Sequence, residues 1–335
     1  MMATGKKILK AAILGFGGMG HCHAAQYGEQ KDVKLVAVCD IDPTKFKLNN
    51  VALNFGNSGK TSMETLRCYT SYEDLIKAEP DLDYIDICLP SDLHCEYSCR
   101  AMNDGFHVLC EKPMALNSAD CDKMIKTSHD TGKLLMIAQC LRFDAIFNKI
   151  RQAYESGKYG KLLRLSLKRM GSFPGGWFRE VKRSGGALMD LHIHDADFIL
   201  SMLGTPASLI ARGVVVKSGG IDDLSVDFIY PNGPIVAAES SWARGEWQCG
   251  MAAIFEDATL YASGDCLTIY QMDQKLKKVK SKAKNCYFNE IAYFAKCVKQ
   301  GRRPAIAAIE STRDTIRVLE LENQSALNNY QELTL

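Results

Sequence analysis

Two charged residues near the middle of the chain have types and a spacing that suit acid–base chemistry. Asp190 and His194 are four residues apart, in a stretch that begins with Gly185-Gly186 and stops at Gly204. In a helix this spacing places both side chains on one face, one turn apart. A carboxylate there can fix the tautomer of the imidazole and raise its basicity. The pair could therefore remove a proton from a hydroxyl group.

Two more polar residues extend this line along the same face. Asp197 and Ser201 stand at i+7 and i+11 from Asp190, and the other positions of the stretch are largely apolar. A solvated helix face would produce the same line, so the spacing leaves a catalytic and a structural interpretation open. His192 lies two residues from His194, but two rings at this spacing diverge on a helix, and we expect no metal site.

A glycine-rich segment near the start has the spacing of a dinucleotide-binding turn. Residues 15–20 read GFGGMG, which is G-x-G-x-x-G. The segment directly follows the apolar run 8–14 and opens a helical stretch. In that context the glycines can form a tight turn and bring a pyrophosphate to the N-terminus of the helix.

A carboxylate at the end of the second apolar run supports this interpretation. Asp40 lies about 20 residues beyond the glycine turn, where it can accept hydrogen bonds from adenosine ribose hydroxyls and repel a 2′-phosphate. Ile41 follows it, rather than an arginine. We therefore expect NAD in preference to NADP, although Lys45 and Lys47 leave room for a relaxed preference.

A lysine follows another apolar run. Glu111-Lys112-Pro113 comes directly after residues 108–110, at the carboxyl end of a predicted central strand, which is the edge where open α/β sheets bind ligands. An ammonium there can polarise a hydroxyl or stabilise an alkoxide as a hydride leaves. Glu111 could bind the nicotinamide ribose. An ion pair of Glu111 with Lys112 at the strand end is the alternative.

Glu111-Lys112-Pro113 resembles the Glu-Lys-Pro signature of the glucose-fructose oxidoreductase, inositol dehydrogenase and MocA (Gfo/Idh/MocA) family. Other segments resemble that family in order and spacing, over nearly the whole chain. They are the glycine turn with Met19 and His23, Asp40, Leu89-Pro90 with His94, residues 139–143 with Arg142, and the Gly-Gly-x-x-x-Asp-x-x-x-His pattern ending at His194. His192 departs from the family, in which many members have glycine.

The resemblance implies roles for particular residues. Lys112, Asp190 and His194 would be catalytic, and Arg142, Trp177 and His194 are candidates for contact with the substrate. Loop packing is an equal alternative for Trp177. The expected cofactor-binding residues are Gly15, Phe16, Gly17, Gly18, Met19, Gly20, Asp40, Ile41, Leu89, Pro90, His94, Glu111 and Lys112.

The elements that must position these residues follow two patterns. Short apolar runs at 8–14, 35–39, 84–89, 108–110 and 134–138 alternate with helical stretches, which predicts a doubly wound parallel Rossmann sheet over residues 1–140. Beyond about residue 143 come a long helix, strands at 209–216, 225–230, 235–242 and 248–255, and helices from about 286 and 310. They predict an α+β domain over residues 141–335 with a large, mostly antiparallel open sheet. We expect the site in a cleft between the domains.

Composition excludes several classes of partner. The chain has 335 residues, with 41 basic and 39 acidic side chains and a net charge of +2, so neither nucleic acid nor a membrane is an expected partner. Glycines interrupt the apolar run that follows the N-terminal lysines, and no stretch approaches the ~20 apolar residues of a membrane span. The thirteen cysteines are scattered without a Cys-x-x-Cys, as in reduced cytoplasmic proteins.

These expectations combine into one function. The sequence predicts a cytoplasmic NAD-dependent oxidoreductase of carbohydrate metabolism that moves a hydride between nicotinamide and a secondary alcohol carbon of a sugar, inositol-like polyol or glycoside. A glycoside-processing enzyme with tightly bound, recycling NAD and a non-catalytic NAD-binding sensor of the same fold are the alternatives. The family resemblance also implies a homodimer or homotetramer.

Overall fold

The computed structural model describes residues 7–48, 51–53, 56–271 and 276–335. The chain divides into two compact units. Unit 1 comprises Met1–Ala115, Ala119–Ala138 and Tyr287–Glu310, and unit 2 comprises Leu116–Ser118, Gln139–Cys286 and Ser311–Leu335. Helix α8, from late in the sequence, thus belongs to unit 1.

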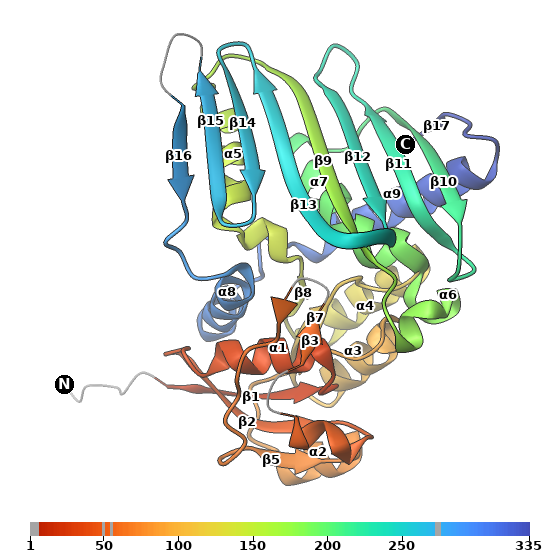
Figure 1. Cartoon of the computed structure of the whole chain (residues 1–335). Coiled ribbons are helices and arrows are strands. Elements are labelled where there is room, and N and C mark those ends of the chain that lie inside the picture. The colour runs from red at the N-terminus through yellow and green to blue at the C-terminus, as the bar shows by residue number, and fades with distance from the viewer. Residues whose placement is uncertain (1–6, 49–50, 54–55, 272–275) are drawn as a thin grey trace. The chain divides into compact units, whose positions relative to one another are not determined.

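Unit 1 is built on a six-stranded sheet in the order β5-β2-β1-β6-β7-β8, in which every pairing is parallel (Figure 1). This is the strand order of doubly wound dinucleotide-binding domains. The central strands are almost wholly buried, as their apolar runs predict. The strands are β1 (Leu9–Leu14), β2 (Val33–Cys39), β5 (Arg67–Tyr69), β6 (Tyr84–Ile87), β7 (His107–Glu111) and β8 (Leu135–Ala138). The predicted Rossmann sheet is confirmed.

Helices complete unit 1. They are α1 (Gly18–Tyr27), α2 (Tyr72–Ala78), α3 (His94–Asn103), α4 (Ser118–Thr131) and α8 (Cys286–Gln300), with the short elements η1 (Pro43–Lys47), β3 (Ala52–Leu53), β4 (Gly56–Asn57) and η2 (Ser91–Leu93). Helix α8 packs on the sheet through Phe294, whose ring meets that of Tyr84 edge-on at 5.1 Å. Lys299 of α8 also contacts Asp32 at 2.6 Å. These contacts hold a helix from late in the sequence against β6 and the start of β2.

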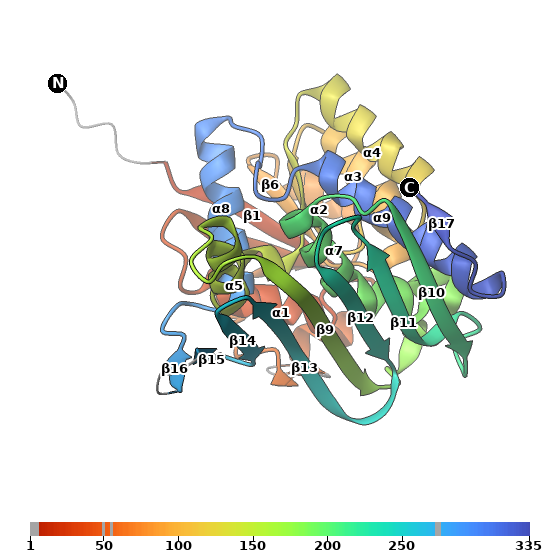
Figure 2. The same cartoon turned by 90° about the horizontal axis from the view of Figure 1, so that it is seen from above.

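Unit 2 contains a nine-stranded sheet in the order β16-β15-β14-β13-β9-β12-β11-β10-β17. All its pairings are antiparallel except that of β9 with β12. Helices α5, α7 and α9 lie along one face of this sheet (Figure 2). The predicted mostly antiparallel sheet is therefore confirmed.

The strands of unit 2 are β9 (Leu162–Ser172), β10 (Ser208–Val215), β11 (Ile221–Ile229), β12 (Ile235–Ser241), β13 (Ala243–Phe255), β14 (Ala258–Ser263), β15 (Cys266–Gln271), β16 (Lys277–Lys280) and β17 (Leu333–Thr334). The helical elements are η3 (Cys140–Phe143), α5 (Ala145–Glu155), η4 (Gly176–Arg179), α6 (Val181–Ser184), η5 (Leu188–His192), α7 (Ile193–Leu203) and α9 (Ile309–Leu327). Within the described ranges, no helix has the length and apolar character needed to cross a membrane. The thirteen cysteines, all in these ranges, are free thiols and mostly buried.

Candidate active site

The glycine turn joins β1 to α1 at the carboxyl edge of the parallel sheet. Gly15 has a φ of +94°, and a Cβ there would lie 2.6 Å from the carbonyl oxygen of Cys88. A Cβ on Gly20 would lie 2.2 Å from the carbonyl oxygen of Gly15, so only glycine fits at either end of the turn. A Cβ on Gly17 would meet nothing within 4 Å. The turn is closed towards the protein and open at Gly17, where a pyrophosphate needs access.

The start of α1 can accept an anion. Its N-cap is Gly17, and its first turn has neither a capping side chain nor an acidic residue. The first N–H groups of the helix and its positive dipole end therefore remain for a ligand. These residues fit a dinucleotide.

Asp40 is fixed beside this turn. Its Oδ2 accepts the N–H of Phe16 at 2.7 Å, and its Oδ1 accepts the N–H of Asp42 at 2.9 Å. The carboxylate thus supports the turn in addition to any contact with a ribose. Ile41, the next residue, is 89% exposed and presents no charge.

The ends of β6 and β7 form the next part of this edge. His94 is buried, with Nδ1 2.7 Å from the carbonyl oxygen of Pro113 and Nε2 2.9 Å from that of Leu89. Glu111 is also buried, and its Oε2 accepts the backbone N–H of Lys112 at 3.0 Å. Lys112, Leu89 and Pro90 are partly exposed. Of His94, Glu111 and Lys112, it is therefore Lys112 that solvent or a ligand can reach.

In unit 2 the helix that carries Asp190 and His194 begins after two glycines in the left-handed region. Gly185 and Gly186 both have a φ of +73°, and a Cβ on Gly186 would lie 2.9 Å from the carbonyl oxygen of Ile221. The first turns, Leu188–His192, are π-helical rather than α-helical. Such π segments are frequent at functional sites.

The predicted polar line divides into two parts. Asp190 and His194 are partly exposed, whereas most of their neighbours on the helix are buried. Asp197 instead accepts two hydrogen bonds from the guanidinium of Arg142, at 2.6 and 2.7 Å, in a buried ion pair. Ser201 is 2.6 Å from Nη2 of Arg151. Asp190 and His194 are therefore accessible from outside, whereas Asp197 and Ser201 are bound to arginine side chains.

The contacts of Arg142 connect elements of unit 2 to one another. Its Nη1 donates to Ser311 at 2.8 Å, and Thr315 donates to Asp197 at 3.1 Å. These contacts join η3, α7 and α9 within unit 2. We assign Arg142 to this junction.

A buried pair and a buried cluster of three polar residues were not predicted from the sequence. Arg169 of β9 donates a hydrogen bond to Asp195 at 2.7 Å. Asp195 is the residue that follows His194 in the sequence. His192 lies within 3.1 Å of Ser240 and 3.2 Å of Glu322, and all three are fully buried. His192 thus lies in a buried polar cluster. The signal available in the sequence was an arginine that interrupts the alternation of an apolar strand.

Trp177 lies in η4, and its ring stacks on that of Phe178 at 3.9 Å. Phe178 in turn packs against the buried cluster of Ala187, Leu191 and Trp242. Trp177 is partly exposed. An aromatic face in this position remains a candidate for contact with a sugar ring.

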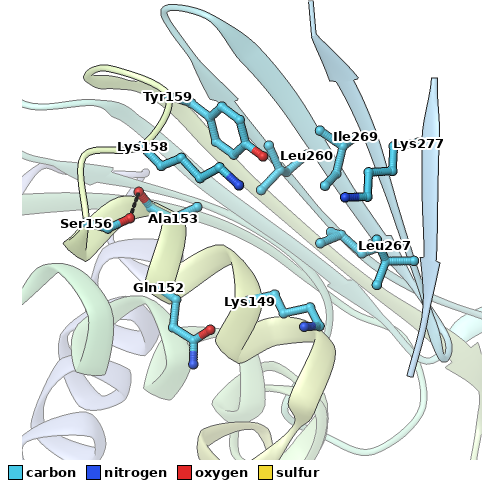
Figure 3. Close-up of a pocket in the computed structure, with 11 residues that line it drawn as sticks. Lys149, Gln152, Ala153, Ser156, Lys158, Tyr159, Leu260, Leu267, Ile269 and Lys277 are labelled. Carbon is cyan, nitrogen blue, oxygen red and sulfur yellow. Dashed lines mark hydrogen bonds between the residues drawn. The ribbon is translucent and has the colours of Figure 1, made fainter. Parts of the chain in front are cut away.

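A hollow of about 300 Å³ lies elsewhere in unit 2, between α5 and strands β14–β16 (Figure 3). Lysines 149, 158 and 277 surround a floor that includes Leu260 and Leu267. The described residues that line it include no carboxylate or imidazole. Because the proposed chemistry needs a proton acceptor, we do not place the active site there.

Among the described residues, potential metal-ligand atoms of three side chains come together at His23, either with Asp86 and Cys88 or with Glu111 and Glu290. Both ring nitrogens of His23 face carboxylate oxygens at 2.9 Å. Carboxylates on both sides favour the protonated form of the ring, so we interpret the group as an ion-pair network.

Comparison with known proteins places the chain in a family. The model "Oxidoreductase family, NAD-binding Rossmann fold" matches residues 9–139, and "GFO/IDH/MocA C-terminal domain" matches residues 147–261. An inositol 2-dehydrogenase of Rhizobium meliloti (strain 1021) is 31% identical over 217 residues, which cover 64% of this chain and 61% of that protein. The match thus spans less than two thirds of that relative. A myo-inositol 2-dehydrogenase of Thermotoga maritima is 25% identical over 318 residues, covering 89% of this chain and 91% of that protein.

Solved structures show the same fold. An aldose-aldose oxidoreductase from Caulobacter crescentus, complexed with glycerol, has a TM-score of 0.85 and 22% identity, covering 98% of this chain and 100% of that one. The family models match both the glycine-turn domain and most of the second sheet, and they confirm the resemblance carried by Glu111-Lys112-Pro113. The chain belongs to the GFO/IDH/MocA oxidoreductase family, and its N-terminal domain is an NAD-binding Rossmann fold.

Proposed function

We propose that the protein is an NAD-dependent dehydrogenase acting on a secondary alcohol of a sugar, inositol-like polyol or glycoside. Bound NAD would supply the acceptor for the hydride of the carbinol carbon. His194 takes the hydroxyl proton, Asp190 orients the imidazole, and the ammonium of Lys112 stabilises the charge that grows on the oxygen. Relatives named inositol 2-dehydrogenase and myo-inositol 2-dehydrogenase support this substrate class.

The observation that carries the proposal is the partial exposure of Asp190 and His194 within the segment 188–199, whose other residues are buried. A structural pair in such a helix would be enclosed, as Asp197 and Arg142 are. A proton acceptor must instead remain within reach of a substrate. Lys112 has the same partial exposure at the end of β7.

NAD is the proposed cofactor in preference to NADP. Asp40 is held beside the glycine turn by two backbone N–H groups and would repel a 2′-phosphate. Ile41 adds no positive charge that could offset this repulsion.

The test is a panel of sugars, inositols, other polyols and glycosides, scanned for NADH absorbance with and without added NAD. We expect turnover of at least one compound that requires added NAD, and its loss in His194→Ala and Lys112→Met. Turnover without added NAD would indicate a recycling cofactor. NAD binding without turnover of any compound would indicate a sensor and contradict the proposal.

We also propose a homodimer or homotetramer formed through the uncovered face of the sheet of unit 2. Large apolar side chains are exposed on its strands, among them Ile235, Tyr261 and Tyr270. Light scattering of the purified protein should give a mass at least twice that of one 37.1 kDa chain. Charged substitutions at Tyr261 and Tyr270 should reduce that mass, and a parent that is monomeric at micromolar concentration would refute the proposal.

A further inference from the structure

A buried histidine of α1 lies between two carboxylates of the parallel sheet. Nδ1 of His23 is 2.9 Å from Oδ2 of Asp86, on β6. On the other side of the ring, Nε2 is 2.9 Å from Oε1 of Glu111, at the end of β7. The second contact is an ion pair rather than a well-aligned hydrogen bond. All three residues are at most 4% exposed.

Other titratable groups enclose the ring of His23. Glu290 of α8 has Oε1 3.9 Å from Nε2. The remaining ones are Tyr27 and Tyr84, which are hydrogen-bonded to each other next to Asp86, Cys88, whose Sγ is 3.7 Å from Nδ1, and Tyr287, whose ring centre is 6.1 Å away. Of the groups named here, His23 alone can carry a positive charge.

Protons on both ring nitrogens of His23 give each of the two carboxylates a positively charged neighbour. A neutral imidazole would present a lone pair to one of the two carboxylates, in a buried place of low dielectric. Burial by itself would lower the pKa of His23, but the attraction and hydrogen bonds of Asp86 and Cys88 together outweigh it, and the pKa is raised well above 6.5. His23 in turn holds the pKa of Glu111 below its usual value although burial opposes this. The pair is an imidazolium and a carboxylate at neutral pH.

The second oxygen of Glu111 connects this pair to the candidate catalytic lysine. Oε2 accepts the backbone N–H of Lys112 at 3.0 Å. The carbonyl oxygen of the next residue, Pro113, lies 2.7 Å from Nδ1 of His94. The backbone on both sides of the Lys112 side chain is therefore tied to a buried histidine, on one side directly and on the other through Glu111.

We propose that His23 is a positioning residue for Lys112, acting through the carboxylate of Glu111. This inference rests on the proposed function of Lys112. His23 lies on the helix that opens with the glycine turn, so the network links that helix to the strand end that carries Lys112. A displacement of a catalytic group by about 1 Å can lower the rate by on the order of a hundredfold. A network that fixes the backbone at Lys112 can therefore affect the rate.

A neutral side chain in place of His23 distinguishes the effect of its charge on Lys112 from the effect of its packing. In His23→Gln, Glu111 stays buried without its positive partner, and burial then raises its pKa. At neutral pH the protonated acid holds Lys112 poorly, and kcat should fall about tenfold, with a smaller change in KM for NAD. As the pH rises through the raised pKa, the carboxylate returns and kcat should recover. The parent, whose Glu111 has a lowered pKa, is already ionised and should show no such additional rise.

Two further variants make the kinetic result specific. His23→Gln combined with Glu111→Gln has no carboxylate to ionise, so kcat should stay low without recovery. His107→Gln is the matched control, because His107 lies at the opposite end of β7, where its Nδ1 accepts the N–H of Leu134 at 2.9 Å. This control should keep the pH profile of the parent.

A second measurement does not depend on catalysis. Nitrogen-15 NMR of the histidine rings should show His23 protonated on both nitrogens in the parent at neutral pH. In Glu111→Gln the pKa of His23 should fall measurably, because the carboxylate nearest to Nε2 is lost. A neutral His23 in the parent would overturn the inference, and this test remains if His23→Gln does not fold.

The outcomes distinguish this inference from the function on which it rests. If Lys112→Met retains normal kcat while NMR shows the charged pair, the proposed function fails and His23 has no lysine to position in catalysis. If Lys112→Met is impaired but His23→Gln keeps the parental kcat and pH profile, the positioning role is refuted. Impairment of both, with alkaline recovery only in His23→Gln, supports the proposal.

Discussion

Removing Asp197 should strongly destabilise unit 2, because it leaves a buried guanidinium without its partner. Asp197→Ala takes two hydrogen bonds of 2.6 and 2.7 Å from Arg142. The side chains of Arg142 and Asp197 are 3% and 1% exposed, so water cannot replace the lost carboxylate. Breaking such a pair from one side costs about 3 to 5 kcal/mol. We expect that loss in the free energy of unfolding.

Urea unfolding followed by tryptophan fluorescence measures this loss in the relevant unit. All three tryptophans of the chain, Trp177, Trp242 and Trp247, lie in unit 2. With an m value of about 3 kcal/mol per M, the midpoint should fall by about 1 M or more. Asp265→Ala is the control, because it removes an exposed ion pair with Lys280 in the same unit and should cost little.

A double variant tests the cause of the effect. Arg142→Met with Asp197→Leu removes both charges and fills their volume, so it should lose less stability than Asp197→Ala alone. A midpoint for Asp197→Ala within about 0.3 M of the parent, which is about 1 kcal/mol, would refute the argument. Arg142 would then remain a candidate for the substrate instead of a structural residue.

Three predictions concern the proposed reaction. Asp40→Ala should weaken NAD far more than NADP in binding titrations, whereas Asp40→Asn, which keeps an acceptor for the turn, should lose less NAD affinity; equal losses for both cofactors in Asp40→Ala would contradict the assignment. His194→Ala should lower kcat by ~10² to 10⁴ with nearly unchanged NAD affinity, and the rise of oxidation with pH through one ionisation should disappear; retention of the parental pH profile would remove His194 from the mechanism. Lys112→Met should lower kcat by ~10² or more while NAD still binds, and Lys112→Arg should restore it only in part, because a planar fork cannot replace a compact ammonium; a raised KM with normal kcat would make Lys112 a substrate anchor.

Local patterns in the sequence were sufficient for five of the six strands of the first sheet and for the glycine turn, but they did not indicate the short edge strand β5. Strands buried on both faces are recognisable as short apolar runs, and the observed β1 and β7 lie within one or two residues of the predicted runs. The turn needs a residue that can adopt a positive φ, and Gly15 has this conformation. The apolar runs and the glycine spacing can be read along the chain, whereas the approach of Gly15 to the carbonyl oxygen of Cys88 arises only when β1 and β6 pair.

Strand β9 of the second sheet was not among the predicted strands. Arg169 occupies a buried position on it and breaks the apolar alternation that identifies a half-buried strand. The charge is acceptable there because Asp195, 26 residues later in the sequence, lies 2.7 Å away. That compensation arises only when the helix and the strand come together.

The sequence by itself determined which residues could do chemistry, and the tertiary structure decided which of them are available for it. Asp190, His194, Asp197 and Ser201 had one helical spacing, but the fold pairs Asp197 with Arg142 and Ser201 with Arg151. His23 was one residue of a motif until α1, β6 and β7 placed it between Asp86 and Glu111. Helical and strand periodicity can be read along the chain, whereas the burial and pairing of charges depend on contacts between distant segments, and those contacts form only in the folded protein.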